Sequence, residues 1–148
     1  MLIPRPGVIA LFLGLMTVSA AAWPLVTPEE DRRDDAAPHV PAPANLPGPP
    51  SIILVRPDVS APIRNPATIE VQFTAGPGNT INMQSFRATY GWLGIDVTRR
   101  ILQHATKTLN SLTAADVDLP RGSHRVTLSI ADSTGKRASR TFNLSVAR

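Results

Sequence analysis

An alternation of apolar and polar side chains in the C-terminal two-thirds of the chain is the strongest constraint on its fold. Over residues 67–75, Ile69, Val71 and Phe73 fall on one side of the chain and polar residues fall on the other. A period of two is typical of a β-strand with one buried face. The same alternation returns over residues 86–92, 126–130 and 142–146.

Turn residues separate the alternating segments. Residues 76–79 (Gly-Pro-Gly-Asn) and 132–135 (Asp-Ser-Thr-Gly) are clusters of this kind, and the glycine of the second suits a hairpin. Further short strands are expected over 51–56 and around 117–119. About seven strands, with turn signals every 8–12 residues, predict an all-β sandwich over residues 51–148.

One segment departs from this period. Between Val97 and Leu112, apolar residues recur at spacings of four, four, four and three, which indicates a helical face. We expect one short helix near residues 98–105, with Thr98 as its N-cap. Arg99 and Arg100 oppose the helix dipole in its first turn.

The N-terminal 22 residues have the layout of a secretory signal. Arg5 precedes an apolar stretch over residues 8–18, and small residues follow at 19–22. The alternative is an uncleaved anchor, because the nearly apolar run over 7–26 approaches the length that spans a bilayer. Either reading exports the rest of the chain, so a periplasmic or secreted location is expected. Contact with a membrane is expected only if the segment is uncleaved.

Residues 23–50 contain eight of the 15 prolines in the chain and show no helical or strand period. Proline removes backbone donors and fixes φ. The segment is therefore predicted to be a disordered, Pro-rich linker between the signal segment and the sandwich.

The strand and turn motifs resemble bacterial immunoglobulin-like (Ig-like) domains of exported proteins, which are single β-sandwiches. The resemblance rests on Pro57, Pro62 and the run Ile-Glu-Val-Gln-Phe at 69–73, on Leu119 to Gly135, and on Thr141 to Val146. It implies a module that makes protein–protein or cell-surface contacts. The chain has no cysteine, so it lacks the cysteine pair of antibody-type domains.

A weaker similarity links the chain to periplasmic copper-resistance β-sandwich proteins. In that family a histidine at or near the mature N-terminus helps to hold copper, whereas this chain has Trp23 there. Its histidines are His39, His104 and His124. Copper sites need several histidine or methionine ligands within reach of one another. No metal ligands and no cofactor are therefore predicted, and a metal or small-ligand carrier stays an alternative.

No catalytic constellation stands out, and we expect no enzyme. Ser123 and His124 lie near Asp116 and Asp118 in sequence, but neighbours on a strand face opposite ways. His124, at the start of a strand, is expected at the surface or an edge. The six acids of residues 51–148 are scattered, which does not favour a carboxylate pair.

Charge is unevenly distributed. Residues 23–50 hold two arginines and five acids, a net charge of −3, whereas residues 51–148 hold twelve basic residues and six acids, a net charge of +6. A basic domain attracts anionic polymers or acidic partners. The candidate basic contact face consists of Arg99, Arg100, Lys107, Lys136, Arg137 and Arg140. Nucleic acid is not expected, because few aromatic residues are present for stacking.

The leading hypothesis is a non-catalytic exported envelope protein whose sandwich contacts an envelope protein partner. The alternatives are a periplasmic carrier of a copper-type metal or small ligand, and electrostatic attachment to an anionic surface polymer.

Overall fold

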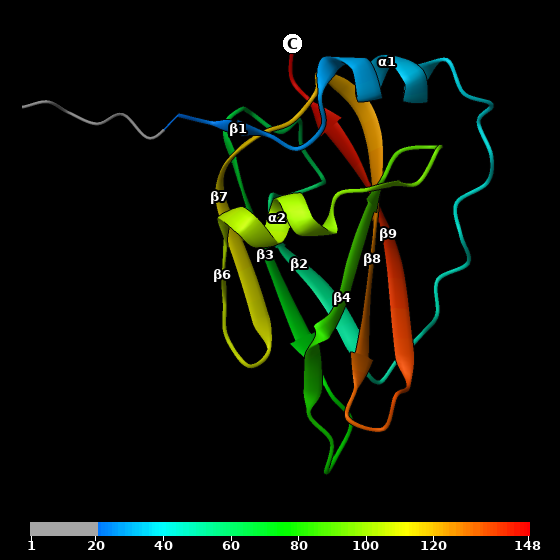
Figure 1. Ribbon diagram of the computed structural model, residues 1–148, viewed down its shortest axis with the longest axis vertical. Coiled ribbons are helices and arrows are strands. Elements are labelled where there is room, and N and C mark those ends of the chain that lie inside the picture. The colour runs from blue at the N-terminus through cyan, green and yellow to red at the C-terminus, as the bar shows by residue number, and fades with distance from the viewer. Residues whose placement is uncertain (1–20) are drawn as a thin grey trace, which may run out of the picture.

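The computed structural model describes residues 21–148, and they form two β-sheets packed face to face with two short helices (Figure 1). The prediction of an all-β sandwich is confirmed. The first sheet has the order β1-β7-β3-β2, with β6 also beside β7, and the second has the order β5-β4-β8-β9. The predicted signal segment, residues 1–22, lies almost entirely outside the described residues. Within residues 21–148, no helix has the length and apolarity needed to cross a membrane.

The strands of the first sheet are β1 (Trp23–Pro24), β2 (Ser51–Arg56), β3 (Ala67–Thr74), β6 (Ala105–Lys107) and β7 (Ser111–Asp118). Those of the second sheet are β4 (Ile81–Tyr90), β5 (Ile95–Asp96), β8 (Gly122–Asp132) and β9 (Arg137–Val146). The helices are α1 (Pro28–Asp35) and α2 (Thr98–His104).

The core lies between the sheets and is built from the alternating apolar positions. Val71 and Phe73 on β3 are almost fully buried, as are Phe86 on β4 and Ile130 on β8. The rings of Phe73 and Phe86 meet edge to face, with their centroids 6.0 Å apart, a favoured aromatic geometry. The sequence pattern therefore assigned the buried faces correctly.

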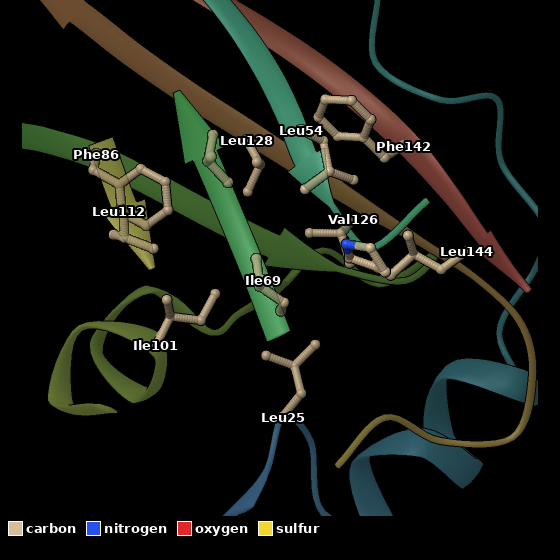
Figure 2. A pocket seen from close by; sticks show the side chains of 12 residues that line it. Leu25, Leu54, Ile69, Phe86, Ile101, Leu112, Val126, Leu128, Phe142 and Leu144 are labelled. Atoms are coloured by element: carbon tan, nitrogen blue, oxygen red, sulfur yellow. The ribbon is translucent and has the colours of Figure 1, made fainter. Parts of the chain in front are cut away.

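A small void remains inside this core (Figure 2). It measures about 30 Å³ and is lined only by apolar side chains, including Leu25, Ile101, Val126 and Phe142. An apolar space of this size stays dry. Ligand pockets usually measure about 300–1,000 Å³. This void is therefore too small to carry an organic ligand.

Helix α2 occupies the predicted place, but Thr98 does not cap it. Its N-cap is Val97, which offers no side-chain hydrogen bond. Thr98 instead accepts a hydrogen bond from the backbone N–H of Ala88, at 2.9 Å, and its own backbone N–H donates to Asp96 Oδ1. The hydroxyl is buried against β4, so it ties the helix to the sheet.

The prediction of a linker without regular structure is wrong for residues 23–36, which we call the N-terminal strap. Trp23 on β1 pairs in parallel with Val117 of β7, and its indole N–H donates to the carbonyl of Ala115 at 2.8 Å. Leu25 is fully buried in the core. The apolar run Trp-Pro-Leu-Val at 23–26 therefore completes the first sheet.

Helix α1 of the strap has signals that the high proline content hid. Thr27 is its N-cap, Pro28 opens the first turn, and Glu30 completes a capping box in which both reciprocal hydrogen bonds are present. Proline at the first helical position costs no hydrogen bond, and this four-residue pattern is a helix-start signature. Local chemistry thus specifies the helix despite the prolines around it.

The rest of the predicted linker, residues 37–50, contains no helix and is largely exposed. It runs alongside β9 (Figure 1), where Leu46 forms an isolated bridge with Ser139, and Asn45 Oδ1 accepts from the N–H of Thr141 at 3.0 Å. These contacts cover part of the outer edge of β9. An uncovered edge would offer free backbone groups to other chains.

Removing the buried side chain of the strap tests whether it belongs to the folded domain. We expect Leu25→Ala to lower the free energy of unfolding by about 2–5 kcal/mol, because the substitution empties a filled core position. Val40→Ala is the matched control in the exposed segment and should change stability by less than about 0.5 kcal/mol. Urea unfolding of both variants measures the difference. Equal stabilities would show that the strap does not pack in solution.

Candidate functional site

Helix α1 docks on the sandwich through acidic side chains. Glu29 faces outward and pairs with Arg32 and Arg33 of the same helix. Glu30, Asp31 and Asp34 instead contact residues from other elements. A short helix with few apolar residues has little to bury, so these polar contacts fix its position.

The first contact joins α1 to α2. The guanidinium of Arg100 donates to both carboxylate oxygens of Glu30, at 2.9 and 3.1 Å, and also to the carbonyl of Leu25 at 2.6 Å. The hydrogen bond from Arg100, together with the backbone N–H of Thr27, lowers the pKa of Glu30 to about 2. A two-point arginine–carboxylate pair of this kind fixes orientation as well as position.

The second contact buries Asp34 against the turn after β4. Its side chain is almost fully enclosed, and Oδ1 accepts from the backbone N–H of Leu93 at 2.7 Å. Gly91 adopts a φ of +74°, and a Cβ there would collide with the carboxylate of Asp34. Glycine is therefore required at this position for two reasons, its left-handed conformation and the close approach of α1.

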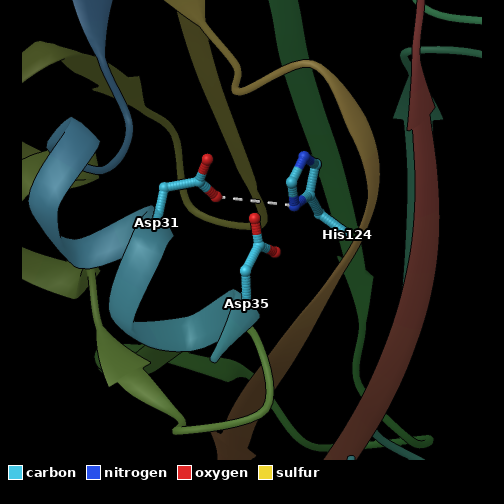
Figure 3. Close-up of side chains that lie close together, drawn as sticks. All are labelled: Asp31, Asp35 and His124. Carbon is cyan, nitrogen blue, oxygen red and sulfur yellow. Dashed lines mark ion pairs between the residues drawn. The ribbon is translucent and has the colours of Figure 1, made fainter. Parts of the chain in front are cut away.

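The third contact is a polar cluster of Asp31, Asp35, Tyr90 and His124, which we call the docking cluster. Figure 3 shows its two carboxylates and its imidazole. The hydroxyl of Tyr90 donates to Asp31 Oδ1 at 2.8 Å and lies 2.5 Å from His124 Nδ1. His124 Nδ1 lies 3.7 Å from Asp31 Oδ1, and the imidazole side chain is only 6% exposed. His124 is therefore not the surface or edge residue that its sequence position suggested.

The hydrogen bonds of the docking cluster fix its protons. Burial, the hydrogen bond to Asp31 and the charge of that carboxylate raise the pKa of Tyr90, so the phenol keeps its one proton and donates it to Asp31. The carbonyl of Arg121, 2.9 Å from His124 Nε2, can only accept, so Nε2 carries a hydrogen. Nδ1 faces the Tyr90 hydroxyl, 2.5 Å away, and the carboxylate of Asp31.

The same atoms form a candidate metal site. One oxygen of Asp31, one oxygen of Asp35 and one ring nitrogen of His124 all lie within 4.8 Å of one another. A donor set of two carboxylates and one imidazole suits divalent ions such as Zn²⁺ or Cu²⁺. It lacks the sulfur ligands that select Cu(I). Asp35 is exposed, so the cluster is open to solvent on that side.

No sequence pattern predicted this cluster. Asp31 and Asp35 fall in the predicted disordered linker, and the sequence brings His124 near only Ser123 and the acids of β7. The capping box at 27–30 was the available signal, because a helix there puts residues 31 and 35 one turn apart on the same face. No local sequence pattern indicates that this face of α1 meets β8.

The predicted basic contact face is divided in the structure. Arg99 and Arg100 lie on α2 and Lys107 on β6 of the first sheet, whereas Lys136, Arg137 and Arg140 lie in or beside β9 of the second. Several of these side chains are already engaged. Arg100 pairs with Glu30, Arg137 donates to the carbonyl of Ser85, and Arg140 donates to the carbonyl of Ile52.

Comparisons with known proteins indicate a distant likeness of fold. No family model matches the sequence, and no curated protein matches it. Among solved structures, CopC from Methylosinus trichosporium OB3b is 17% identical, with a TM-score of 0.41, over 65% of this chain and 93% of that chain.

The pairing of Glu30 with Arg100 makes stability depend on pH. The pKa of Glu30 is about 2 in the folded protein, below its ordinary value of 4.5. The pair is therefore fully stabilising above about pH 4.5, and its contribution disappears as the pH falls toward 2. Unfolding free energies measured between pH 6 and pH 2.5 should fall less steeply for Glu30→Gln than for the original chain. Parallel curves would contradict the pairing.

Proposed function

We propose that the protein is a non-catalytic exported β-sandwich that binds a divalent transition-metal ion at Asp31, Asp35 and His124. The observation that carries this proposal is the convergence of three ligand atoms within 4.8 Å of one another where α1 meets β8. Of the readings drawn from the sequence, the metal carrier is the one that this geometry favours.

The orientation of His124 supports the proposal. Its Nε2 donates to the carbonyl of Arg121 while Nδ1 faces the carboxylates. Metal-binding histidines usually donate their second ring N–H to a carbonyl or carboxylate, which fixes the ring and its tautomer. The contact with Arg121 fixes the orientation of the His124 ring before any ion binds.

The charge of the cluster also supports a cation. Two carboxylates face His124, and a divalent ion would balance the charge of both. The Tyr90 hydroxyl lies 2.5 Å from Nδ1, so it must move aside when Nδ1 binds an ion.

The number of ligands favours reversible binding over a structural role. Structural zinc sites usually have four protein ligands, whereas sites with three protein ligands keep a position for exchange. Asp35 is exposed and gives an ion access from solvent. These features suit a carrier that takes up and releases its ion.

Titration with Zn²⁺, Cu²⁺ and Ca²⁺ tests the proposal. We expect micromolar Zn²⁺ or Cu²⁺ to stabilise the protein, by about 2.7 kcal/mol at one hundred times Kd, with little effect of Ca²⁺. Asp35→Asn should weaken binding at least about tenfold, because it removes one charged ligand. Calorimetry gives the affinities, and thermal unfolding gives the stabilisation.

Asp116→Asn is the matched control for this titration. Asp116 lies on β7 outside the cluster and has a φ of 55°, a conformation that asparagine tolerates well. Its substitution should leave metal affinity unchanged. Absence of stabilisation by either transition metal, or an equal loss in both variants, would refute the proposed site.

A second function, contact with an envelope protein, has support from strand β2. This strand ends its sheet, and Ile53 and Val55 project outward with 48% and 41% of their surfaces exposed. An edge strand with apolar side chains favours pairing with a strand of another protein.

Site-specific photocrosslinking in cells tests this second function. A crosslinker at Ile53 should capture one dominant partner, whereas one at Leu109, the highly exposed residue in the turn before β7, should not. The same products from both positions would indicate collisions and not a specific interface.

A further inference from the structure

A hollow of about 720 Å³ lies at the end of the sandwich where the chain leaves β9, on the side marked C in Figure 1. Three separate segments border it: the loop before β3, the turn between β7 and β8, and the residues after β9. Its charged lining consists of Arg64, Arg121, Arg148 and Asp118. We call it the arginine hollow, and its size suits a small ligand.

The arginines of this hollow lack the hydrogen-bond and ion-pair partners that most arginines of the described residues have. Within residues 21–148 there are twelve arginines. Eight of them donate to a carboxylate, a carbonyl or a hydroxyl. The four whose guanidinium groups make no hydrogen bond or ion pair in this part of the chain are Arg64, Arg99, Arg121 and Arg148. Three of these four border the same hollow.

Hydrogen bonds from one side chain and from the backbone hold the three segments together. The side chain of Asn65 donates to the carbonyl of Leu119 at 2.6 Å and accepts from its N–H at 3.0 Å, which joins the first loop to the β7–β8 turn. Ile63 donates to the carbonyl of Ser145, and Ala147 donates to the carbonyl of Ile63. Arg64, Arg121 and Arg148 are therefore brought together by the fold before any ligand binds.

We propose that the arginine hollow binds a small ligand that carries phosphate or carboxylate groups. A guanidinium presents several N–H donors in a planar fork that matches such oxyanions. Three unpaired guanidiniums outweigh the one carboxylate of Asp118, so the hollow attracts negative charge. The carboxylate of Asp118 repels an anion on one side of the hollow, so removing this negative charge should strengthen binding.

This anion site is separate from the proposed metal site and does not depend on it. The two share only the β7–β8 turn, where the backbone carbonyl of Arg121 accepts from His124 while its side chain lines the hollow. Substitution of the arginine side chains leaves that carbonyl in place. Circular dichroism and thermal unfolding check that the variants remain folded.

Calorimetric titration of the full chain with inorganic pyrophosphate tests the inference. We expect saturable, salt-sensitive binding that falls about tenfold or more in the double variant Arg64→Gln/Arg121→Gln. Asp118→Asn should bind pyrophosphate more tightly than the original chain. Arg99→Gln is the matched control, because Arg99 is the fourth arginine of residues 21–148 whose guanidinium has no partner. It is exposed and lies on α2 outside the hollow.

A parallel assay with vesicles containing phosphatidylglycerol distinguishes the source of the anion. Arginine-dependent binding to pyrophosphate alone identifies a soluble ligand, and arginine-dependent binding to vesicles alone identifies a lipid headgroup. Either result supports the site. Binding to neither probe, or equal weakening in Arg99→Gln and in the double variant, would overturn it.

Discussion

The structure depends on the docking of the N-terminal strap onto the sandwich. Trp23 and Leu25 supply apolar surface to the first sheet, and the acidic side chains of α1 supply polar contacts to the second sheet, to the turn after β4 and to α2. Neither set is sufficient alone, because an isolated eight-residue helix is unstable in water. Burial of the apolar run at 23–26 places α1 against the sandwich. Glu30, Asp31 and Asp34 then fix the orientation of this helix.

This docking explains the uneven charge of the chain. The net charges of residues 23–50 and 51–148 are opposite in sign, which by sequence suggests that a basic domain awaits an anionic partner. Part of that complement belongs to the chain itself, because Glu30 pairs with Arg100 and two carboxylates of α1 surround His124. Three of the four arginines without a side-chain partner in residues 21–148 border the arginine hollow, and for this reason the proposed anion site lies there and not at α2.

Docking also creates the candidate metal site. Asp31 and Tyr90 are 59 positions apart in the sequence, and Tyr90 and His124 are 34 apart. The site exists only when α1, β4 and β8 are in contact, so binding of an ion and docking of the strap stabilise each other. A chain that lost the strap would keep its sandwich pattern but lose two of the three ligands.

The sequence by itself determined the elements whose signals are local. The alternation over 67–75 placed Val71 and Phe73 in the core, and apolar spacing placed a helix near 98–105, since side-chain period follows backbone geometry. The capping box at 27–30 also specified α1, although proline content concealed it. Only the tertiary structure decided which acids meet which bases, that His124 is enclosed, and that three unpaired arginines border one hollow. Such contacts join residues far apart in the chain, and their geometry depends on how the sheets and the strap pack, which no local pattern records.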